Sequence, residues 1–202
     1  NVIEPILSFS QFERLTIDLV NLQCYKESND EYSYILTYID CFSQYVFARP
    51  LFSKEAKEVA EELVKIFEQI MPPTILHSDN GGEFVANVIF ELAEKYKIEL
   101  KNGGPYHPQS QGRVERFNQT LERQLGKYLT ENNDRRWLEI LPNIVRTYNI
   151  TVHEVTNRSP FNVLYGWKPS NWYKLPNISS SPIDILSFGM LHALNYHLPY
   201  IR

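Results

Sequence analysis

The sequence has little cysteine and no long apolar run. Its two cysteines, Cys24 and Cys41, are too few for a disulfide framework, so we interpret both as packing residues in a reducing compartment. The apolar stretches are far shorter than the ~20 residues that span a bilayer, so no membrane partner is expected. The His and Cys residues are not spaced as in a zinc site, so no zinc is expected either.

Positive charge is scarce in the first half of the chain and in excess in the second. Residues 1–100 hold 8 Lys and Arg against 17 Asp and Glu, whereas residues 101–202 hold 12 against 7. Four of the later basic residues fall on one predicted helix, namely Arg113, Arg116, Arg123 and Lys127. A basic helix is a site where nucleic-acid phosphates bind, although the same charges also suit an ordinary solvated surface.

The first seventy residues predict three strands followed by a helix. Apolar and β-branched runs indicate strands at 16–20, 32–39 and 44–51, with residues 41–43 as the turn between the last two. Hairpin connections make these three strands antiparallel neighbours. Apolar residues at three- and four-residue spacing then predict a helix over 54–69, which Pro72 and Pro73 end.

The next part alternates strand and helix, and the chain then turns helical. We expect elements of two kinds: strands at 74–77 and 98–100, and helices at 84–96, from Gly112 onward, at 137–152 and at 160–165. Residues 101–111 read as a loop. Helical crossovers make the later strands parallel to the first, which predicts an α/β fold with a mixed sheet. Ser159 is the expected N-cap of the last helix, and Gly166 is expected to end it.

Three acidic residues occupy positions that favour a metal site. Asp18 lies inside an apolar strand, Asp79 directly follows the predicted strand at 74–77, and Glu115 lies near the start of a helix. Each has a structural interpretation, because Asp79 before Asn-Gly-Gly can shape a turn and Glu115 can complement a helix dipole. A carboxylate in the setting of Asp18 costs several kcal/mol unless it is compensated. Together the three indicate divalent metal and phosphoryl transfer. Glu83 is interpreted as a surface acid, with a fourth acid near the metals as the alternative.

These residues belong to longer motifs that resemble a known family. Asp18, the Ser-Asp-Asn-Gly-Gly-Glu-Phe run at 78–84, and the Tyr-His-Pro-Gln-Ser-Gln-Gly run at 106–112 leading into Glu115 resemble retroviral and Ty3/gypsy retrotransposon integrase catalytic cores. The resemblance implies a ribonuclease-H-like fold with a five-stranded mixed sheet, flanking helices and a C-terminal helical extension. Asn21 and Leu22 depart from it, because the family usually has Gly-Pro there.

The resemblance also implies an activity and a set of partners. Asp18, Asp79 and Glu115 would bind two Mg²⁺ or Mn²⁺ ions and catalyse 3′-end processing and strand transfer on DNA. A homodimer or higher oligomer is implied, and the nucleus is the expected location. Candidate DNA contacts around the acids are His107, Gln109, Arg113, Arg116, Asn118, Gln119, Arg123 and Lys127.

Four segments follow from these assignments. We expect an N-terminal lead-in over 1–13, an integrase-like catalytic core over 14–130, a helical extension over 131–170, and a tail of unknown role over 171–202. No zinc module precedes the core motifs, so we expect an isolated core. Two alternatives stay open: a plain ribonuclease-H-like nuclease, and a domesticated module that binds DNA or protein without catalysis.

Overall fold

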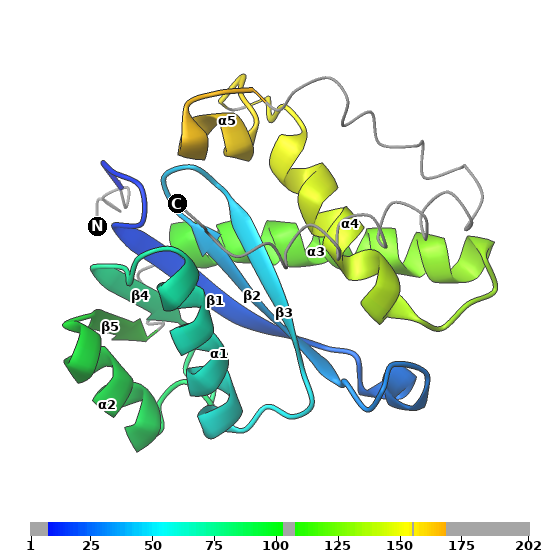
Figure 1. Ribbon diagram of the computed structural model, residues 1–202, viewed down its shortest axis with the longest axis horizontal. Coiled ribbons are helices and arrows are strands. Elements are labelled where there is room, and N and C mark those ends of the chain that lie inside the picture. Colours follow the sequence, from blue (N-terminus) through cyan, green and yellow to red (C-terminus); the bar gives the residue numbers. More distant parts are fainter. Residues whose placement is uncertain (1–7, 103–107, 155, 169–202) are drawn as a thin grey trace, which may run out of the picture. The chain divides into compact units, whose positions relative to one another are not determined.

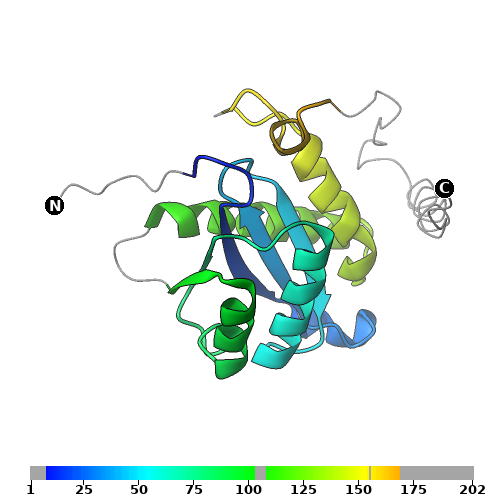
Figure 2. The ribbon, with the colours of Figure 1, turned by 60° about the vertical axis from the view of Figure 1, so that its left-hand side comes forward.

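Five strands form one mixed sheet at the centre of the computed structural model, in the order β3-β2-β1-β4-β5. The structure describes residues 8–102, 108–154 and 156–168, all of which belong to one compact unit, residues 1–168. Figures 1 and 2 show helices on both faces of this sheet. Among the described residues, no helix is both long and apolar enough to cross a bilayer.

The strand pairing confirms the predicted topology. β1 is antiparallel to β2 and β2 to β3, whereas β4 runs parallel to β1 and β5 parallel to β4. The bounds of the five strands are Arg14–Asn21 for β1, Tyr34–Asp40 for β2, Val46–Leu51 for β3, Ile75–Ser78 for β4 and Glu99–Asn102 for β5. β3 begins two residues later than predicted, because Gln44 has a φ of 63° and turns the chain before the strand.

Helices α1 (Ala56–Gln69) and α2 (Asn87–Tyr96) cover one face of the sheet. Their apolar sides meet alternate residues of the strands, because side chains along a strand point to opposite faces. The resulting core contains the following buried residues: Leu15, Ile17, Leu36, Tyr38, Val59, Leu63, Ile66, Leu76, Ile89 and Leu92. α2 begins at Asn87 rather than at Phe84, whose buried ring belongs to the preceding turn.

Helices α3 (Pro108–Glu131) and α4 (Trp137–Ile150) belong to the opposite face and its edge. The predicted apolar stripe of α3 is confirmed, since Val114, Phe117, Leu121, Leu125 and Tyr128 are all buried. The short helix α5 (Pro160–Tyr165) also has its predicted ends. The hydroxyl oxygen of Ser159 accepts a hydrogen bond from the Asn162 amide at 3.2 Å, and Gly166 adopts a φ of 78°.

The start of α3 corrects the predicted loop. The helix begins at Pro108, four residues before Gly112, so the loop assignment was wrong for residues 108–111. Proline is favoured in a first helical turn, and the run of Gly, Pro and Ser hid this start from composition alone. Glu115 therefore lies in the third turn, and α3 has no acidic residue in its first turn. Its interpretation as a carboxylate that complements the helix dipole is wrong.

The residues that depart from the integrase pattern have structural roles. The Oδ1 atom of Asn21 accepts a hydrogen bond from the Gln23 amide at 3.0 Å, which starts an unpredicted 3₁₀ helix, η1 (Gln23–Ser28). The side chain of Leu22 is buried. Asn21 and Leu22 thus turn the chain out of β1 without disturbing the strand that carries Asp18.

Asn149 attaches α4 to the outer edge of the sheet. Its Oδ1 atom accepts a hydrogen bond from the Val46 amide at 2.9 Å, and its Nδ2 atom donates to the Val46 carbonyl at 2.8 Å. β3 is an edge strand, so these two backbone groups have no neighbouring strand to bind. One buried amide side chain therefore takes the place of a strand at this position.

Replacing this amide leaves a buried donor and a buried acceptor unsatisfied. We expect Asn149→Ala to lower the free energy of unfolding by about 2–4 kcal/mol, because each orphaned backbone group costs about 1–3 kcal/mol. Urea denaturation measures the change. The control is Asn87→Ala on an exposed position of α2, for which we expect a change of about 0.5 kcal/mol or less. Equal effects of the two substitutions would contradict the assigned role.

Candidate active site

The sheet register brings Asp18 and Asp79 to the same level of neighbouring strands. Thr16 of β1 pairs with His77 of β4, and the acids follow two residues later on each chain. Because alternate residues point to one face, Asp18 lies on the same side of the sheet as Thr16, the side that α3 contacts. β4 ends at Ser78, so Asp79 is the first residue beyond the strand. The prediction that a strand delivers Asp79 at its C-terminal end is confirmed.

Asp18 is half-buried, and each of its carboxylate oxygens accepts one hydrogen bond. Oδ1 accepts from the Leu19 amide and Oδ2 from Nδ2 of Asn118, both at 2.8 Å. Burial raises the pKa of Asp18, and the negative charges of Asp79 and Glu115 raise this pKa further, against the lowering effect of the two hydrogen bonds. The charges of Asp79 and Glu115 thus act on Asp18, which lies in the middle of β1.

Asp79 forms the turn that the sequence suggested and lies beside a fourth acid. Its Oδ1 atom accepts a hydrogen bond from the Gly81 amide at 2.9 Å. A Cβ atom at Gly81 would lie 3.0 Å from this Oδ1 and 2.9 Å from Cδ of Glu83, so two carboxyl groups pack against the same glycine. A side chain at position 81 would therefore push these two carboxyl groups aside. Glu83 is half-buried and its carboxyl group lies beside Asp79, which favours the alternative of a fourth acid near the site over a plain surface role.

The donor set suits a divalent cation that prefers oxygen ligands. Mg²⁺ and Mn²⁺ bind carboxylates, and a cation would remove the repulsion that raises the pKa of Asp18. Among the described residues, no Lys or Arg forms an ion pair with Asp18, Asp79 or Glu115. Within the same part of the chain, no group of three or more His, Cys, Asp or Glu side chains is yet arranged to hold a metal ion. The metal triad therefore stays a prediction.

The candidate DNA contacts fall into three groups. Arg116, Gln119, Arg123 and Lys127 are exposed on α3. Arg113 and Asn118 are instead used within the protein: Nη1 of Arg113 donates to the Cys41 carbonyl at 2.7 Å, and the Asn118 amide is 8% exposed and bound to Asp18. The predicted contact of Asn118 with DNA is therefore corrected to a contact with the acid. His107 and the side chain of Gln109 lie outside the described residues.

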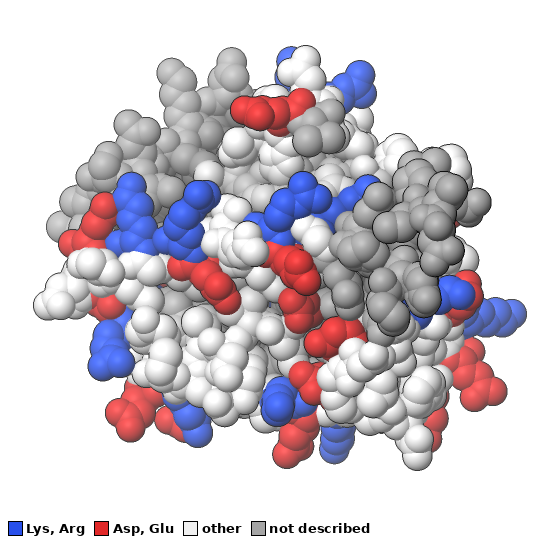
Figure 3. Space-filling view, turned by 180° about the vertical axis from the view of Figure 1, so that it is seen from behind, with Lys and Arg blue, Asp and Glu red and all other residues white. Residues whose placement is uncertain are grey.

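The exposed basic residues of α3 form a row along one side of the helix. Arg116, Arg123 and Lys127 are seven and four positions apart, which places them on one face over about 16 Å. We call these three residues the α3 basic row. Figure 3 shows Lys and Arg gathered in a band on the side of the molecule where α3 lies, with Asp and Glu next to it. Glu115 precedes Arg116, so the row begins beside the acids.

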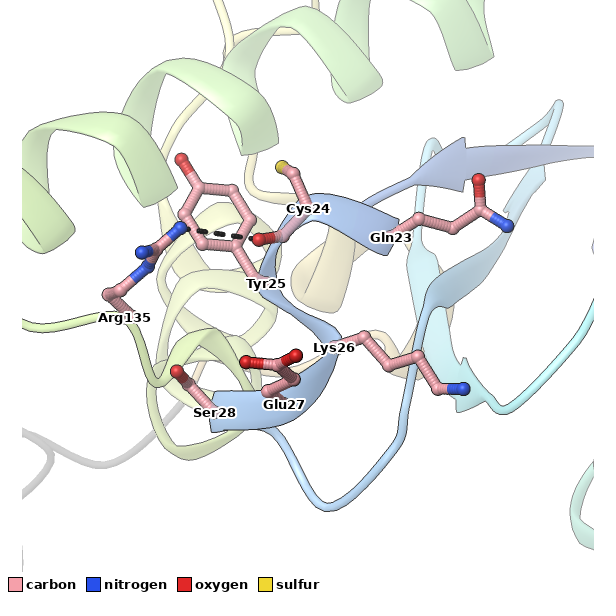
Figure 4. A pocket seen from close by; sticks show the side chains of 7 residues that line it. All are labelled: Gln23, Cys24, Tyr25, Lys26, Glu27, Ser28 and Arg135. Carbon is pink, nitrogen blue, oxygen red and sulfur yellow. Dashed lines mark hydrogen bonds between the residues drawn. The ribbon is translucent and has the colours of Figure 1, made fainter.

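A separate pocket of about 260 Å³ is lined by η1 and by Arg135 (Figure 4). Nη2 of Arg135 donates to the Cys24 carbonyl at 3.3 Å, and its guanidinium lies 5.6 Å from the centre of the Tyr25 ring. None of the three acids lines this pocket. Cys24 is exposed here, so its interpretation as a packing residue is wrong, whereas Cys41 is buried as predicted.

One polar residue near the acids was missed by the sequence analysis. Thr37 is fully buried in β2, directly opposite Asp18 of β1. Its hydroxyl lies 3.0 Å from Oδ1 of Asn118. A threonine in a strand is ordinary, because β-branched residues favour strands, and only the pairing register shows that this one faces the acid.

Comparison with known proteins agrees with this geometry. The integrase core domain family matches residues 10–108. An uncharacterized transposon-derived protein of Caenorhabditis elegans is 34% identical over 146 residues, which are 70% of this chain and 49% of that protein. The Pol polyprotein of Radiation murine leukemia virus is 36% identical over 174 residues, which are 85% of this chain and 28% of the polyprotein. The chain thus spans half or less of these relatives.

Solved structures show the same fold. The catalytic core domain of HTLV-2 integrase in complex with magnesium superposes with TM-scores of 0.64 for its trimeric form and 0.63 for its dimeric form, each at 17% identity. These matches cover 79% and 78% of this chain, and 100% and 99% of the HTLV-2 chains. The five-stranded mixed sheet with flanking helices is the ribonuclease-H-like fold of integrase cores. The chain is a homologue of retroviral integrase catalytic cores and belongs to the integrase core domain family.

Proposed function

We propose that this chain is the catalytic core of a metal-dependent DNA polynucleotidyl transferase, which trims DNA 3′-ends and joins them to a second DNA. The observation that supports this proposal is the strand register, which sets Asp18 and Asp79 at the same level of neighbouring strands on the side that α3, the helix of Glu115, contacts. The pKa of Asp18 is raised by burial and by both other charges. Neighbouring negative charges of this kind are suited to binding a divalent metal ion, which in turn binds phosphate.

Each part of the site has a role in this reaction. Asp18, Asp79 and Glu115 would hold two Mg²⁺ or Mn²⁺ ions. Such ions, when bound, activate the attacking oxygen and stabilise the leaving oxygen of a phosphoryl transfer. The Asn118 amide and the Leu19 amide orient Asp18. The α3 basic row binds the DNA backbone and aligns it with the acids. The chain acts as a homodimer or higher oligomer in the nucleus.

Two other functions use the same fold. A plain nuclease would need the same acids but would release cleaved DNA without joining it. A domesticated module would bind DNA and catalyse nothing, and the similarity to a transposon-derived worm protein favours this alternative over the nuclease. A branched DNA that mimics a strand-joined product distinguishes the three, because its resolution requires cleavage and rejoining together.

We expect the purified chain to resolve this branched DNA in Mn²⁺ or Mg²⁺, and Glu115→Gln to lower the rate by about 10²–10³-fold. Loss of one metal ligand removes several kcal/mol of transition-state stabilisation. Gel analysis of labelled strands gives the rates. The matched control is Glu122→Gln, an exposed acid two turns further along α3, which should react at the parent rate. Cleavage without rejoining would identify the nuclease, and DNA binding without reaction would identify the inert module.

The raised pKa of Asp18 predicts how its removal changes stability with pH. A carboxyl whose folded pKa is raised destabilises the fold once pH exceeds that pKa, and costs nothing below the ordinary Asp pKa of about 4. In metal-free buffer, Asp18→Asn should therefore unfold at a higher temperature than the parent at neutral pH. The difference should shrink as pH falls through the folded pKa. Thermal unfolding across pH measures it, with exposed Asp30→Asn as the control.

Magnesium should reverse the order of these two proteins. Bound to the folded state alone, Mg²⁺ at one hundred times its dissociation constant stabilises the parent by about 2.7 kcal/mol. Asp18→Asn lacks a ligand and should gain much less. An equal rise in unfolding temperature for both proteins would mean that Mg²⁺ binds elsewhere.

The α3 basic row predicts a salt dependence of DNA binding. Each phosphate contact releases about one counterion, so Arg123→Gln should reduce the slope of log affinity against log salt by about 1. Fluorescence anisotropy with a labelled duplex measures this slope. Lys54→Gln, an exposed residue just before α1, should leave it unchanged. A slope that responds equally to both substitutions would remove the row from the DNA-binding surface.

A further inference from the structure

The hydroxyl of Thr37 has only acceptors beside it. The side chain is fully buried in β2, opposite Asp18 in the strand register. Its Oγ1 atom lies 3.0 Å from Oδ1 of Asn118 and 3.2 Å from the backbone carbonyl oxygen of Asp18. Neither of these oxygens can donate, so the threonine hydroxyl is the donor.

This donor holds the oxygen of the Asn118 amide. With its oxygen toward the Thr37 hydroxyl, the amide directs its NH₂ group to Oδ2 of Asp18 at 2.8 Å. The opposite orientation would place the amide oxygen against the carboxylate of Asp18, and that contact would be repulsive. Asp18 therefore sets the orientation of the amide, and the Thr37 hydroxyl holds the amide oxygen in that orientation.

We propose that Thr37 is a positioning residue, which fixes the Asn118 amide so that its NH₂ group orients the carboxylate of Asp18 for metal binding. The inference rests on the proposed function, in which Asp18 is a metal ligand. Thr37 touches no substrate and acts only through Asn118.

The hydrogen bonds also join three separate elements. Asp18 belongs to β1, Thr37 to β2 and Asn118 to α3, and Glu115 lies one helical turn before Asn118. A residue three positions away on a helix lies about 4.5 Å along the axis and about 60° around it, so both residues move with the helix as one body. The Thr37–Asn118–Asp18 chain of hydrogen bonds therefore holds α3 at the position from which Glu115 reaches the other two acids.

Valine at position 37 keeps the shape of threonine and removes the donor. The Asn118 oxygen is then buried without a partner, and the amide is held less firmly against Asp18. Groups that orient a metal ligand in this way change metal affinity by about 10–100-fold when they are lost. We expect Thr37→Val to weaken Mn²⁺ binding by about tenfold, and Thr37→Ser to restore the parent affinity.

Electron paramagnetic resonance titration of free Mn²⁺ measures the affinity, beside a matched control. Thr16→Val removes another fully buried threonine hydroxyl from the same face of β1, one that lies 3.4 Å from Sγ of Cys41 and not from Asn118. Thr16→Val should bind Mn²⁺ like the parent. Equal losses in both valine variants, or no loss in Thr37→Val, would overturn the proposal.

A double-mutant cycle tests whether Thr37 acts through Asn118. In an Asn118→Leu background, Thr37→Val should have no further effect on Mn²⁺ affinity. Additive losses would show that Thr37 acts independently and would overturn the proposal.

A readout without metal or DNA separates this inference from the proposed function. In metal-free protein, the Asn118 side-chain NH₂ protons should exchange slowly by NMR in the parent and in Thr37→Ser, and quickly in Thr37→Val. That result supports the positioning role even if the chain resolves no branched DNA. Failure to resolve the DNA would count against the proposed function only. Slow exchange in all three proteins would overturn the positioning role even if the parent resolves the branched DNA.

Discussion

The half-buried carboxylate of Asp18, in the middle of β1 and beside the C-terminal end of β4, is the constraint on which the candidate site depends. Asp18 is half-buried, and its pKa is raised by burial and by the charges of Asp79 and Glu115. Neutral hydrogen-bond donors, the Leu19 amide and the Asn118 side chain, bind the Asp18 carboxylate, and no Lys or Arg in the described part of the chain forms an ion pair with it. A neutral donor orients a carboxylate and keeps its charge, so the acids stay able to attract a cation.

Helix α3 connects the three acids to the α3 basic row, the surface that we propose binds DNA. Its buried stripe fixes the rotation of the helix against the sheet, and that rotation turns Asn118 inward and Arg116, Arg123 and Lys127 outward. The helix has 24 residues and is about 36 Å long. Because it is one continuous helix, the position of the α3 basic row is fixed relative to Glu115. One packing interface thus positions both the third acid and the charges that hold phosphates, and a shift of α3 would disturb both.

The sheet and the acids could be predicted from the sequence because their signals are local. Apolar runs and hairpin turns determine β1 to β3, and a carboxylate inside an apolar strand stands out, as Asp18 does. The start of α3 was misjudged because Gly and Pro indicate a loop as readily as a first helical turn. The roles of Thr37 and Asn149 depend on pairing between residues 81 and 103 positions apart, which no local pattern carries. The family resemblance supplied the triad's role, whereas the contacts of Asn118 came from the fold alone.

The negative charge of Asp18 and its neighbouring acids helps to distinguish a catalytic core from an inert DNA-binding module. A module that only docked on DNA would gain from the α3 basic row but not from Asp18, Asp79 and Glu115, whose negative charges repel phosphate. The same acids destabilise the metal-free fold at neutral pH, since burial and like charge both oppose ionisation of Asp18. Divalent metal reverses both effects at once, because it neutralises the acids and attracts the phosphate. The negative charge that destabilises the metal-free fold is therefore the same charge that would bind the metal. A catalytic core needs this charge, whereas a docking module does not.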